Sequence, residues 1–289
     1  MKTIGGLVIE NTDNLWLRTW LLFSLKLHLS EHRPQSEHLA ALAQLQPSTP
    51  LIIAISGAQG SGKTSLAAAL QLLWAEHHVQ SDVISLDDYY LEPAQRAERA
   101  HLWHPLFAER GVPGTHDTEL LSSQLAGFRQ GKAQAWRRYD KALDRAGTCS
   151  EPSSARLLIV EGWCLGLTAQ TEQTLRPAIN ALELLQDPDA SWRHKVNQQL
   201  ACEYQQIWQQ FDRLIWLNAP DWQAVCRWRA WQEHPLQQRG LGKTPAELEH
   251  FMLYFQRLTE ESWRQLPDRA DFILTLDQQH QLKKLTPDE

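Results

Sequence analysis

Three glycines, a lysine and a threonine lie within eight consecutive residues, Gly57-Ala-Gln-Gly-Ser-Gly-Lys-Thr64. This stretch matches the pattern G-x-x-x-x-G-K-[ST] at every position, and it lies between a predicted strand and a predicted helix. Glycines allow the backbone to turn tightly so that successive N–H groups face one centre, and the start of a helix adds positive potential there. The chemistry that this arrangement predicts is the binding of a polyphosphate.

Two residues of this stretch are expected to act through their side chains. Lys63 would neutralise the β- and γ-phosphates during transfer, and the Thr64 hydroxyl would take one position on Mg²⁺, whose other ligands are mostly phosphate oxygens and water. The other nucleotide-binding positions, which act mainly through the backbone, are Gly57, Ala58, Gln59, Gly60, Ser61, Gly62 and Ser65. ATP and Mg²⁺ are therefore the predicted cofactors. A glycine-rich turn without a ligand is the alternative.

Two adjacent aspartates, Asp87 and Asp88, end a second predicted strand. Phosphoryl transfer to an alcohol needs a carboxylate that orients the hydroxyl and accepts its proton, and ligands of open α/β sheets bind at the carboxyl ends of strands. Adjacent residues of an extended chain point to opposite sides. We therefore expect Asp87 to be the catalytic base in contact with the acceptor, and Asp88 to hold a metal-bound water or a structural partner. Capping of the next segment is the alternative for both, above all for Asp88.

Another acidic residue ends the apolar stretch Leu157-Leu-Ile-Val-Glu161. From the end of a buried strand, Glu161 is placed to hold the magnesium ion through water. Gly162 follows it and would let a ligand approach the backbone closely. The predicted metal-binding residues are therefore Thr64, Asp88 and Glu161.

A basic segment runs from Arg227 to Lys243. Arg227-Trp-Arg229 ends a helical stretch, and Glu233–Lys243 is polar with two glycines and a proline, which predicts a mobile connection. We assign a lid to residues 227–245. Arginines on a closing lid would stabilise charge on the transferred phosphoryl group and exclude water. Arg227 and Arg229 are the predicted catalytic arginines, with Arg239 as a further candidate. A solvated helix face is the alternative for each of them.

Apolar runs of strand length alternate with stretches of helical composition. The predicted strands are Leu51–Ser56, Asp82–Asp87, Leu157–Glu161, Leu214–Leu217 and Phe272–Leu276, and a helix is predicted from Lys63 to His77. Parallel strands need crossover connections, which helices supply. The pattern predicts an α/β fold in which a parallel sheet carries helices on both faces.

A chain of 289 residues fits one large α/β domain with insertions. Apolar residues recur at helical spacing from Asn14 to Leu45, so residues 1–48 are expected to form helices before the core. The polar stretch from Glu92 to Ser154 reads as a helical insertion that shapes a substrate site. We therefore expect one domain over residues 1–289, with an insertion at 92–154 and the lid.

The composition indicates which kinds of partner and which cellular compartment to expect. A net charge of -6 argues against a nucleic-acid surface. The four cysteines lie far apart and indicate neither a disulfide framework nor a zinc site, so a reduced, cytoplasmic protein is expected. Arg18 and Lys26 interrupt the apolar stretch Leu15–Leu29, which therefore predicts neither a signal peptide nor a membrane span. The expected partner is a small molecule.

Further motifs give the chain a family resemblance. They are Ser85-Leu-Asp-Asp-Tyr-Tyr-Leu91, Arg110-Gly-Val-Pro-Gly-Thr-His-Asp117, Arg138-Tyr-Asp-Lys141, Val160-Glu-Gly-Trp163 and Trp228-Arg-Ala-Trp-Gln-Glu233. With the phosphate loop, they resemble P-loop kinases of the phosphoribulokinase and uridine kinase class, most closely D-glycerate 3-kinase. The resemblance implies a nucleoside-kinase-like P-loop NTPase fold and supports Asp87 as the base. It also implies that the acceptor is an alcohol, with D-glycerate as the leading candidate.

The expected acceptor contacts come from the end of the second predicted strand and from the segment that follows it. A glycerate carboxylate needs cationic or backbone donors, and the residues expected to contact the acceptor are Asp87, Tyr89, Arg110, His116, Arg138 and Lys141. The stretch after Lys141 and the lid sequence Thr244-Pro-Ala-Glu247 depart from the glycerate kinase pattern. Pantothenate, a nucleoside or a sugar are therefore alternative acceptors. A non-catalytic ATP-binding regulatory protein is an alternative of a different class.

Overall fold

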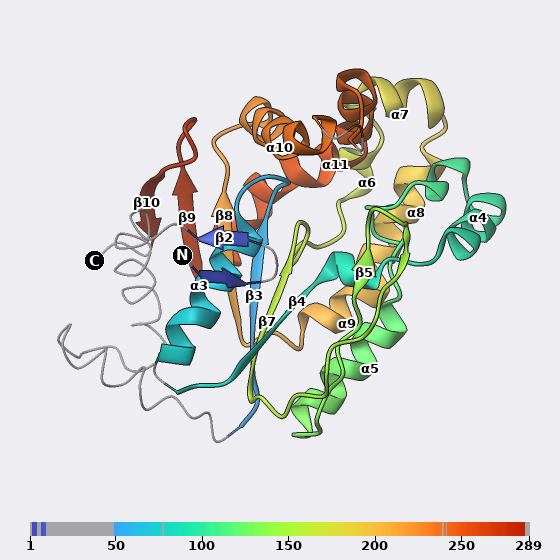
Figure 1. Cartoon of the computed structure of the whole chain (residues 1–289). Helices are drawn as coiled ribbons and strands as arrows, with labels where there is room; N and C mark the ends of the chain where they lie inside the picture. Colours follow the sequence, from blue (N-terminus) through green and yellow to red (C-terminus); the bar gives the residue numbers. More distant parts are fainter. Residues whose placement is uncertain are drawn as a thin grey trace.

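Six strands form the central sheet of the protein (Figure 1). The computed structural model describes residues 2–4, 7–9, 49–76, 78–238, 240 and 242–286. The strand order is β10-β9-β8-β3-β7-β4, and the bounds are β3 (Leu51–Gly57), β4 (Ser81–Ser85), β7 (Leu157–Gly162), β8 (Arg213–Asn218), β9 (Phe272–Leu276) and β10 (Leu282–Thr286). All neighbours pair in parallel except β10, which runs antiparallel to β9. The predicted parallel sheet is confirmed. A separate antiparallel pair joins β1 (Lys2–Ile4) to β2 (Leu7–Ile9).

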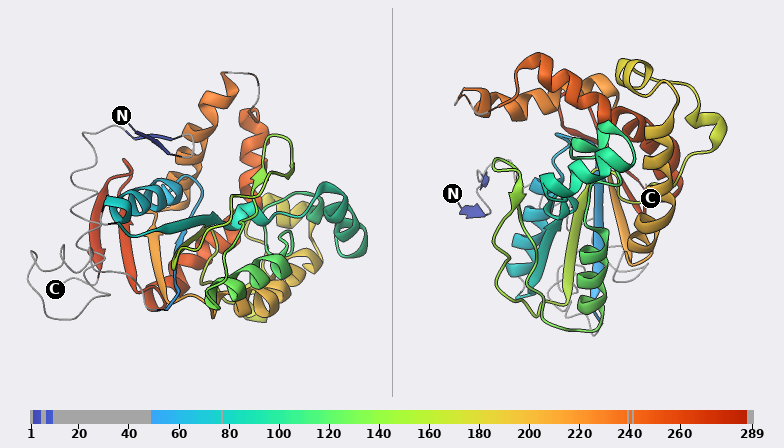
Figure 2. Two further views of the ribbon diagram at one scale, coloured as in Figure 1. Left: turned by 60° about the horizontal axis from the view of Figure 1, so that its bottom comes forward. Right: turned by 90° about the vertical axis from the view of Figure 1, so that its right-hand side faces the viewer.

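Helices cover both faces of this sheet, as the alternating pattern predicts. On one face α3 (Lys63–Glu76) and α10 (Trp222–Gln237) pack on residues such as Ile53 and Ile55. On the other face lie α5 (Thr118–Arg129), α9 (Gln205–Trp208) and α11 (Pro245–Gln265). Figure 2 (right) shows α3 and α5 on opposite sides of the strands. Burial on both faces explains why the central strands are continuous apolar runs rather than alternating ones.

The segment between β4 and β7 is only partly helical. It contains η2 (Leu86–Tyr89), α4 (Pro93–Leu102), η3 (Pro105–Ala108) and α5, and then a small hairpin of β5 (Tyr139–Asp140) and β6 (Arg145–Ala146). The segment between β7 and β8 consists of α6 (Glu172–Leu175), α7 (Ala181–Gln186), α8 (Ser191–Gln199), the π-helical turn η4 (Leu200–Tyr204) and α9. The predicted insertion therefore ends in a hairpin that the sequence pattern does not reveal.

Helices α10 and α11 lie side by side beyond the carboxyl ends of the strands (Figures 1 and 2). The predicted polar connection was expected from Glu233 onward, but α10 continues through Pro235 to Gln237. A proline in the last turn removes few helical hydrogen bonds, so the helix tolerates it there. The short η5 (Leu266–Asp268) follows α11.

Most predicted bounds agree with the structure within a residue or two. The clearest correction is β4, which ends at Ser85 rather than at Asp87, because Ser85 caps the 3₁₀ turn η2. The helices predicted between Asn14 and Leu45 lie outside the described residues. No helix among the described residues is long and apolar enough to cross a membrane. All four cysteines are free, as expected.

Candidate active site

The glycine-rich loop connects the end of β3 at Gly57 to the start of α3 at Lys63. Gly60 (φ +77°) and Gly62 (φ +94°) adopt the left-handed backbone conformation that favours glycine. A Cβ atom on Gly60 would also lie 2.8 Å from the Cβ of Trp228 on α10. Two independent constraints, conformation and space, therefore require glycine at position 60. The strand–loop–helix geometry matches the predicted phosphate cradle.

Lys63 folds back over its own loop. Its Nζ donates a hydrogen bond to the Ala58 carbonyl oxygen at 2.9 Å. Burial lowers the pKa of Lys63, while the nearby negative charges of Glu161 and Asp87 oppose that shift. The ammonium group thus lies among the carboxylates and beside the loop, where it can exchange the carbonyl for a phosphate oxygen.

Thr64 and Glu161 form a candidate metal-binding pair. The Thr64 Oγ1 donates a hydrogen bond to Glu161 Oε1 at 3.1 Å, and Glu161 is buried on β7, the strand beside β3. Burial raises the pKa of Glu161, and Lys63 opposes that shift. No group of three or more His, Cys, Asp or Glu side chains in the described part of the chain is arranged to hold a metal. A hydroxyl and one carboxylate nevertheless fit Mg²⁺, which takes its remaining ligands from phosphates and water.

Asp87 lies in η2 and is held by two side chains. Tyr90 donates its hydroxyl proton to Asp87 Oδ1 at 2.9 Å, and Lys141 Nζ donates to Oδ2 at 2.5 Å. Burial alone would raise the pKa of Asp87, but the charge and hydrogen bond of Lys141 hold it well below its usual range. Lys141 comes from the β5–β6 hairpin, far along the chain from η2. The carboxylate is therefore ionised, with Lys141 paired to one oxygen and Tyr90 to the other.

Asp88 has different partners from its neighbour, as expected. Its Oδ2 accepts hydrogen bonds from the Ser85 backbone N–H at 3.1 Å and from Arg138 at 2.9 Å, and its Oδ1 accepts from the Tyr139 backbone N–H at 3.2 Å. The bond to Ser85 completes the capping box of η2. These three bonds give Asp88 the capping and structural role that was the alternative to binding the metal.

Two of the arginines expected at the acceptor are engaged in holding the hairpin. Arg110 Nη1 lies 2.5 Å from Asp144 Oδ1, and Arg110 also donates to the Lys141 carbonyl oxygen. Arg138 pairs with Asp88 and donates to the Val83 carbonyl oxygen. The structure therefore brings Lys141 to Asp87 but pairs Arg110 and Arg138 with other acids.

His116 is fully buried and stacks on the ring of Tyr90, with ring centroids 4.7 Å apart. Its Nδ1 lies 2.6 Å from the hydroxyl oxygen of Tyr204, which also accepts a hydrogen bond from the Gly114 backbone N–H. Burial lowers the pKa of His116 to about 3, so the ring is neutral. The Tyr204 proton has no other acceptor among the described residues, so it is donated to Nδ1 and the ring proton lies on Nε2. This Nε2 has no partner in the described part of the chain.

Of the two tyrosines in the motif Asp-Asp-Tyr-Tyr, the structure places Tyr90, not the predicted Tyr89, beside Asp87. Tyr89, predicted to contact the acceptor, is buried in the core, and its hydroxyl donates to Gln124 Oε1 on α5 at 2.6 Å. Tyr90 reaches Asp87 instead. The 3₁₀ turn rotates successive side chains by about 120°, not the 180° of a strand, and so changes which tyrosine faces the site. Sequence reasoning also missed Tyr204, because no local pattern links it to His116.

The lid arginines lie close to the loop but pair with protein groups. Arg229 Nη1 lies 2.6 Å from Glu233 Oε2, one turn further along α10. Arg227 donates to Gln278 in the turn between β9 and β10. From the same turn His280 stacks on Trp228, with ring centroids 4.3 Å apart. Arg239 lies outside the described residues. Helix α10 and this turn therefore cover the glycine-rich loop.

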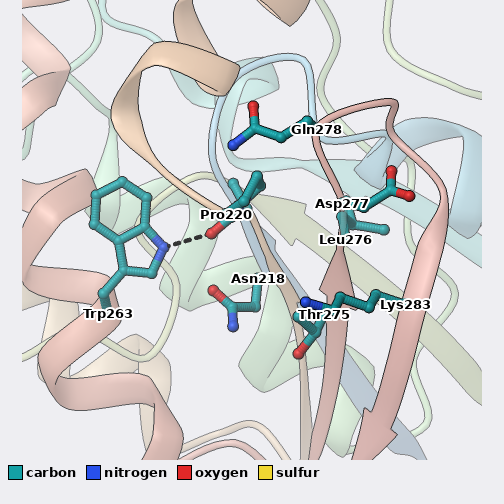
Figure 3. A pocket seen from close by; sticks show the side chains of 9 residues that line it. Asn218, Pro220, Trp263, Thr275, Leu276, Asp277, Gln278 and Lys283 are labelled. Carbon is teal, nitrogen blue, oxygen red and sulfur yellow. Dashed lines mark hydrogen bonds between the residues drawn. The ribbon is translucent and has the colours of Figure 1, made fainter.

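Two cavities open near these groups. One, of about 670 Å³, is lined by Thr64, Asp87, Lys141 and Glu161. The other, of about 420 Å³, lies at the carboxyl ends of β8 and β9 (Figure 3). Its wall includes Trp263, whose indole N–H donates to the Ala219 carbonyl oxygen at 2.8 Å. The first cavity joins the candidate base, the candidate metal pair and the start of α3, and it is the candidate catalytic cavity.

Comparison with known proteins shows which proteins this chain is similar to. No protein-family model matches the chain. A kinase of Schizosaccharomyces pombe described as uncharacterized is 33% identical over 209 residues, which is 66% of this chain and 72% of that protein. The chloroplastic D-glycerate 3-kinase of Arabidopsis thaliana is 28% identical over 218 residues, 70% of this chain. The chain spans only 45% of the length of that plant enzyme.

A solved structure shows the same fold. The D-glycerate 3-kinase of Cryptococcus neoformans superposes with a TM-score of 0.71 at 21% identity, covering 92% of this chain and 96% of that one. The fold is therefore the P-loop NTPase fold that the loop and the sheet indicate. The chain is an ATP-using kinase, and it belongs to the family of P-loop kinases, with D-glycerate 3-kinases and pantothenate kinases among the proteins similar to it.

Proposed function

We propose that the protein transfers the γ-phosphoryl group of ATP to a hydroxyl of a small hydroxy acid, with D-glycerate as the leading acceptor. The observation that carries the proposal is the position of Asp87. Its carboxylate shares one cavity with Thr64 and Glu161, which adjoin the phosphate loop. A base for the acceptor hydroxyl and the groups that handle the phosphates therefore lie around the same space.

Each residue has a role that its contacts support. The loop amides and Lys63 bind the phosphates, and Thr64 together with Glu161 would hold Mg²⁺. That ion supplies positive charge against the phosphate oxygens. Asp87 accepts the proton of the acceptor hydroxyl, whose oxygen bonds to the γ-phosphorus as the bond to the ADP oxygen breaks. Arg229 belongs to the part of α10 that packs on Gly60, and Arg227 and Arg229 would turn from Gln278 and Glu233 towards the phosphates as the lid closes.

D-glycerate is proposed on two grounds. Two of the similar proteins are D-glycerate 3-kinases, and the cavity carries Lys141, whose ammonium group can pair with a carboxylate. The Nε2–H of the neutral His116 ring is a further donor near Asp87, because this ring stacks on Tyr90, whose hydroxyl donates to Asp87. A small acid with one carboxylate and adjacent hydroxyls suits these donors.

A larger acceptor is the second candidate. The cavity of about 670 Å³ is of a size that takes drug-sized ligands, and a three-carbon acid fills only part of it. Pantothenate, a nucleoside or a sugar would use more of this space. The non-catalytic alternative is disfavoured because Lys63, Thr64, Asp87 and Glu161 are all present and close together. The free cysteines suit a reducing compartment such as the cytoplasm.

A coupled assay of ADP release over a panel of acceptors tests the proposal. The panel contains D- and L-glycerate, other hydroxy acids, pantothenate, nucleosides and sugars, each with ATP and Mg²⁺. We expect the highest kcat/KM with D-glycerate. A higher value with another compound would replace the acceptor but keep the kinase. The absence of stimulation by every compound would overturn the proposed function.

A further inference from the structure

The side chains that line the catalytic cavity carry more negative than positive charge, which disfavours the binding of an anionic acceptor. Its lining includes five carboxylates, those of Asp82, Asp87, Asp88, Glu151 and Glu161, and two cations, Arg138 and Lys141. Arg138 is paired with Asp88 at 2.9 Å. An anionic acceptor would therefore be repelled unless Lys141 turns to it, because Lys141 is the remaining cation of that lining.

Lys141 is paired with the candidate base itself. Its Nζ lies 2.5 Å from Asp87 Oδ2, and its side chain is 55% exposed. Arg96, by contrast, is a buried arginine held by Asp144 and by two backbone carbonyl oxygens. The Lys141 ammonium group has a long, flexible stem and one carboxylate partner, so its charge can move without breaking other bonds.

The backbone under Lys141 is fixed. Asp144, three residues further on, accepts hydrogen bonds from Arg96, Arg110 and the Tyr139 hydroxyl. The carboxylate of Asp140 accepts the backbone N–H groups of the two residues that follow Lys141. The hairpin is thereby anchored on both sides of Lys141. A change of partner at this position is a side-chain movement, not a loop movement.

We propose that Lys141 is an acceptor-operated latch on Asp87. Without acceptor, the ammonium group occupies the carboxylate and keeps it from accepting a proton from water. An acceptor with an anionic group a few bonds from its hydroxyl inserts between the two side chains, and Lys141 moves to that anion. Asp87 then receives the hydroxyl proton, the hydroxyl oxygen bonds to the γ-phosphorus, and the bond to ADP breaks. Lys141 keeps its own proton throughout.

The latch rests on the proposed function and adds to it a basis for choosing the acceptor. It selects a hydroxy acid over a neutral sugar or nucleoside, because a neutral molecule brings no anion to draw Lys141 from Asp87. It also limits the hydrolysis of ATP when no acceptor is present, since a water molecule meets a base that is already paired. The 2.5 Å between Nζ and Oδ2 means that one small molecule can contact both groups once they separate.

The variant Lys141→Met tests the latch, with Arg145→Met as the matched control. Arg145 is an exposed cation of the same hairpin and has no contact with Asp87. For Lys141→Met we expect KM for D-glycerate to rise at least tenfold while KM for ATP stays unchanged. We also expect ATP hydrolysis without acceptor to rise several-fold. The preference for glycerate over glycerol, its uncharged analogue, should shrink. Arg145→Met should match the wild type in all three, and Lys141→Arg should retain part of the preference.

The possible results distinguish a failure of the latch from a failure of the proposed kinase function. Unchanged KM for glycerate and unchanged basal hydrolysis in Lys141→Met, with an active wild type, would overturn the latch alone. A wild type that no acceptor stimulates would overturn the proposed function and the latch together. Thermal unfolding of each variant checks that it is folded, and Lys141→Arg supplies the same comparison of acceptors if Lys141→Met is not.

Discussion

At the scale of single residues, partners rather than residue types decide the roles of the acidic groups. Asp87 and Asp88 are adjacent and chemically identical. One faces the cavity and is held by Tyr90 and Lys141, and the other caps η2 and anchors the hairpin. The sequence placed both at the end of a strand and suggested that they differ. It could not give the distant partners, Arg138 and Lys141, because these lie about fifty positions further along the chain.

Asp87→Asn should separate catalysis from nucleotide binding. Asparagine keeps the shape of the side chain but cannot accept the hydroxyl proton, so we expect kcat to fall by about 10² to 10⁴. The affinity for ATP should change little, because no hydrogen bond among the described residues joins Asp87 to the loop. Steady-state kinetics and calorimetric titration with ATP measure the two quantities. If Asp87→Asn were as active as the wild type, the base assignment would be wrong.

His116 should make stability depend on pH in the acidic range. Burial lowers the pKa of His116 to about 3, whereas an unfolded chain holds histidine near 6.5. Between these values only the unfolded state binds the proton, so the contribution of His116 to stability is complete above pH 6.5 and is lost as pH falls towards 3. From pH 6.5 to 5 the loss amounts to about 2 kcal/mol.

Urea unfolding of the wild type and of His116→Gln at pH 6.5 and 5 checks this expectation. The free energy of unfolding should fall less in the variant, because glutamine does not titrate. Equal slopes of free energy against pH in the two proteins would contradict a buried, neutral His116. The comparison cancels the other histidines, which both proteins share.

At the scale of elements, the π-helical turn η4 brings Tyr204 to the site. A π turn inserts an extra residue into a helix and changes the direction of the side chains that follow, and such turns are frequent at functional sites. Here it directs the Tyr204 hydroxyl to His116 and to the backbone N–H of Gly114. Helix composition alone gives no sign of this turn. The same holds for the hairpin of β5 and β6, which tertiary ion pairs stabilise.

Tyr204→Phe should weaken acceptor binding without disturbing ATP. Removing the hydroxyl leaves the Gly114 N–H and His116 Nδ1 without a partner and costs about 1–3 kcal/mol of stability. It also frees the imidazole proton to occupy either nitrogen, so KM for the acceptor should rise while KM for ATP stays constant. Nitrogen-15 NMR of the histidine ring reports the tautomer directly. Tyr254→Phe is the control, because no hydrogen bond of the Tyr254 hydroxyl is found among the described residues. A wild-type tautomer and KM in Tyr204→Phe would refute the arrangement.

At the scale of the whole molecule, the alternation of apolar runs and helical stretches was enough to predict the sheet. The five predicted strands are the five parallel strands of the structure, because burial on both faces leaves a plain apolar signal in each. Two errors have local causes, the capped turn after Ser85 and the continuation of α10 through Pro235. A tertiary contact decides the third, because Tyr89 turns to Gln124 on α5. The position of the glycine-rich loop between a strand and a helix was predictable, because the sequence pattern that marks it is local.

Nucleotide and metal should stabilise the molecule as a whole. A ligand at one hundred times its dissociation constant adds about 2.7 kcal/mol to the free energy of unfolding. We expect ATP with Mg²⁺ to raise the melting temperature, and removal of the metal with EDTA to reverse most of the rise. Lys63→Ala should show a much smaller increase. Differential scanning fluorimetry measures these shifts, and a melting temperature that ATP and Mg²⁺ leave unchanged would argue against nucleotide binding at the loop.

Because Gly60 packs against α10, the glycine-rich loop and this helix, which are far apart in the sequence, cannot be changed independently. Even a single methyl group at position 60 would collide with the Trp228 side chain and its backbone. A protein engineer who wishes to alter the loop must therefore redesign the helix in the same step. The atoms nearest to that methyl group are the Trp228 Cβ and backbone atoms of residues 228 and 229, so a substitution at position 228 alone would not make room for a side chain at position 60.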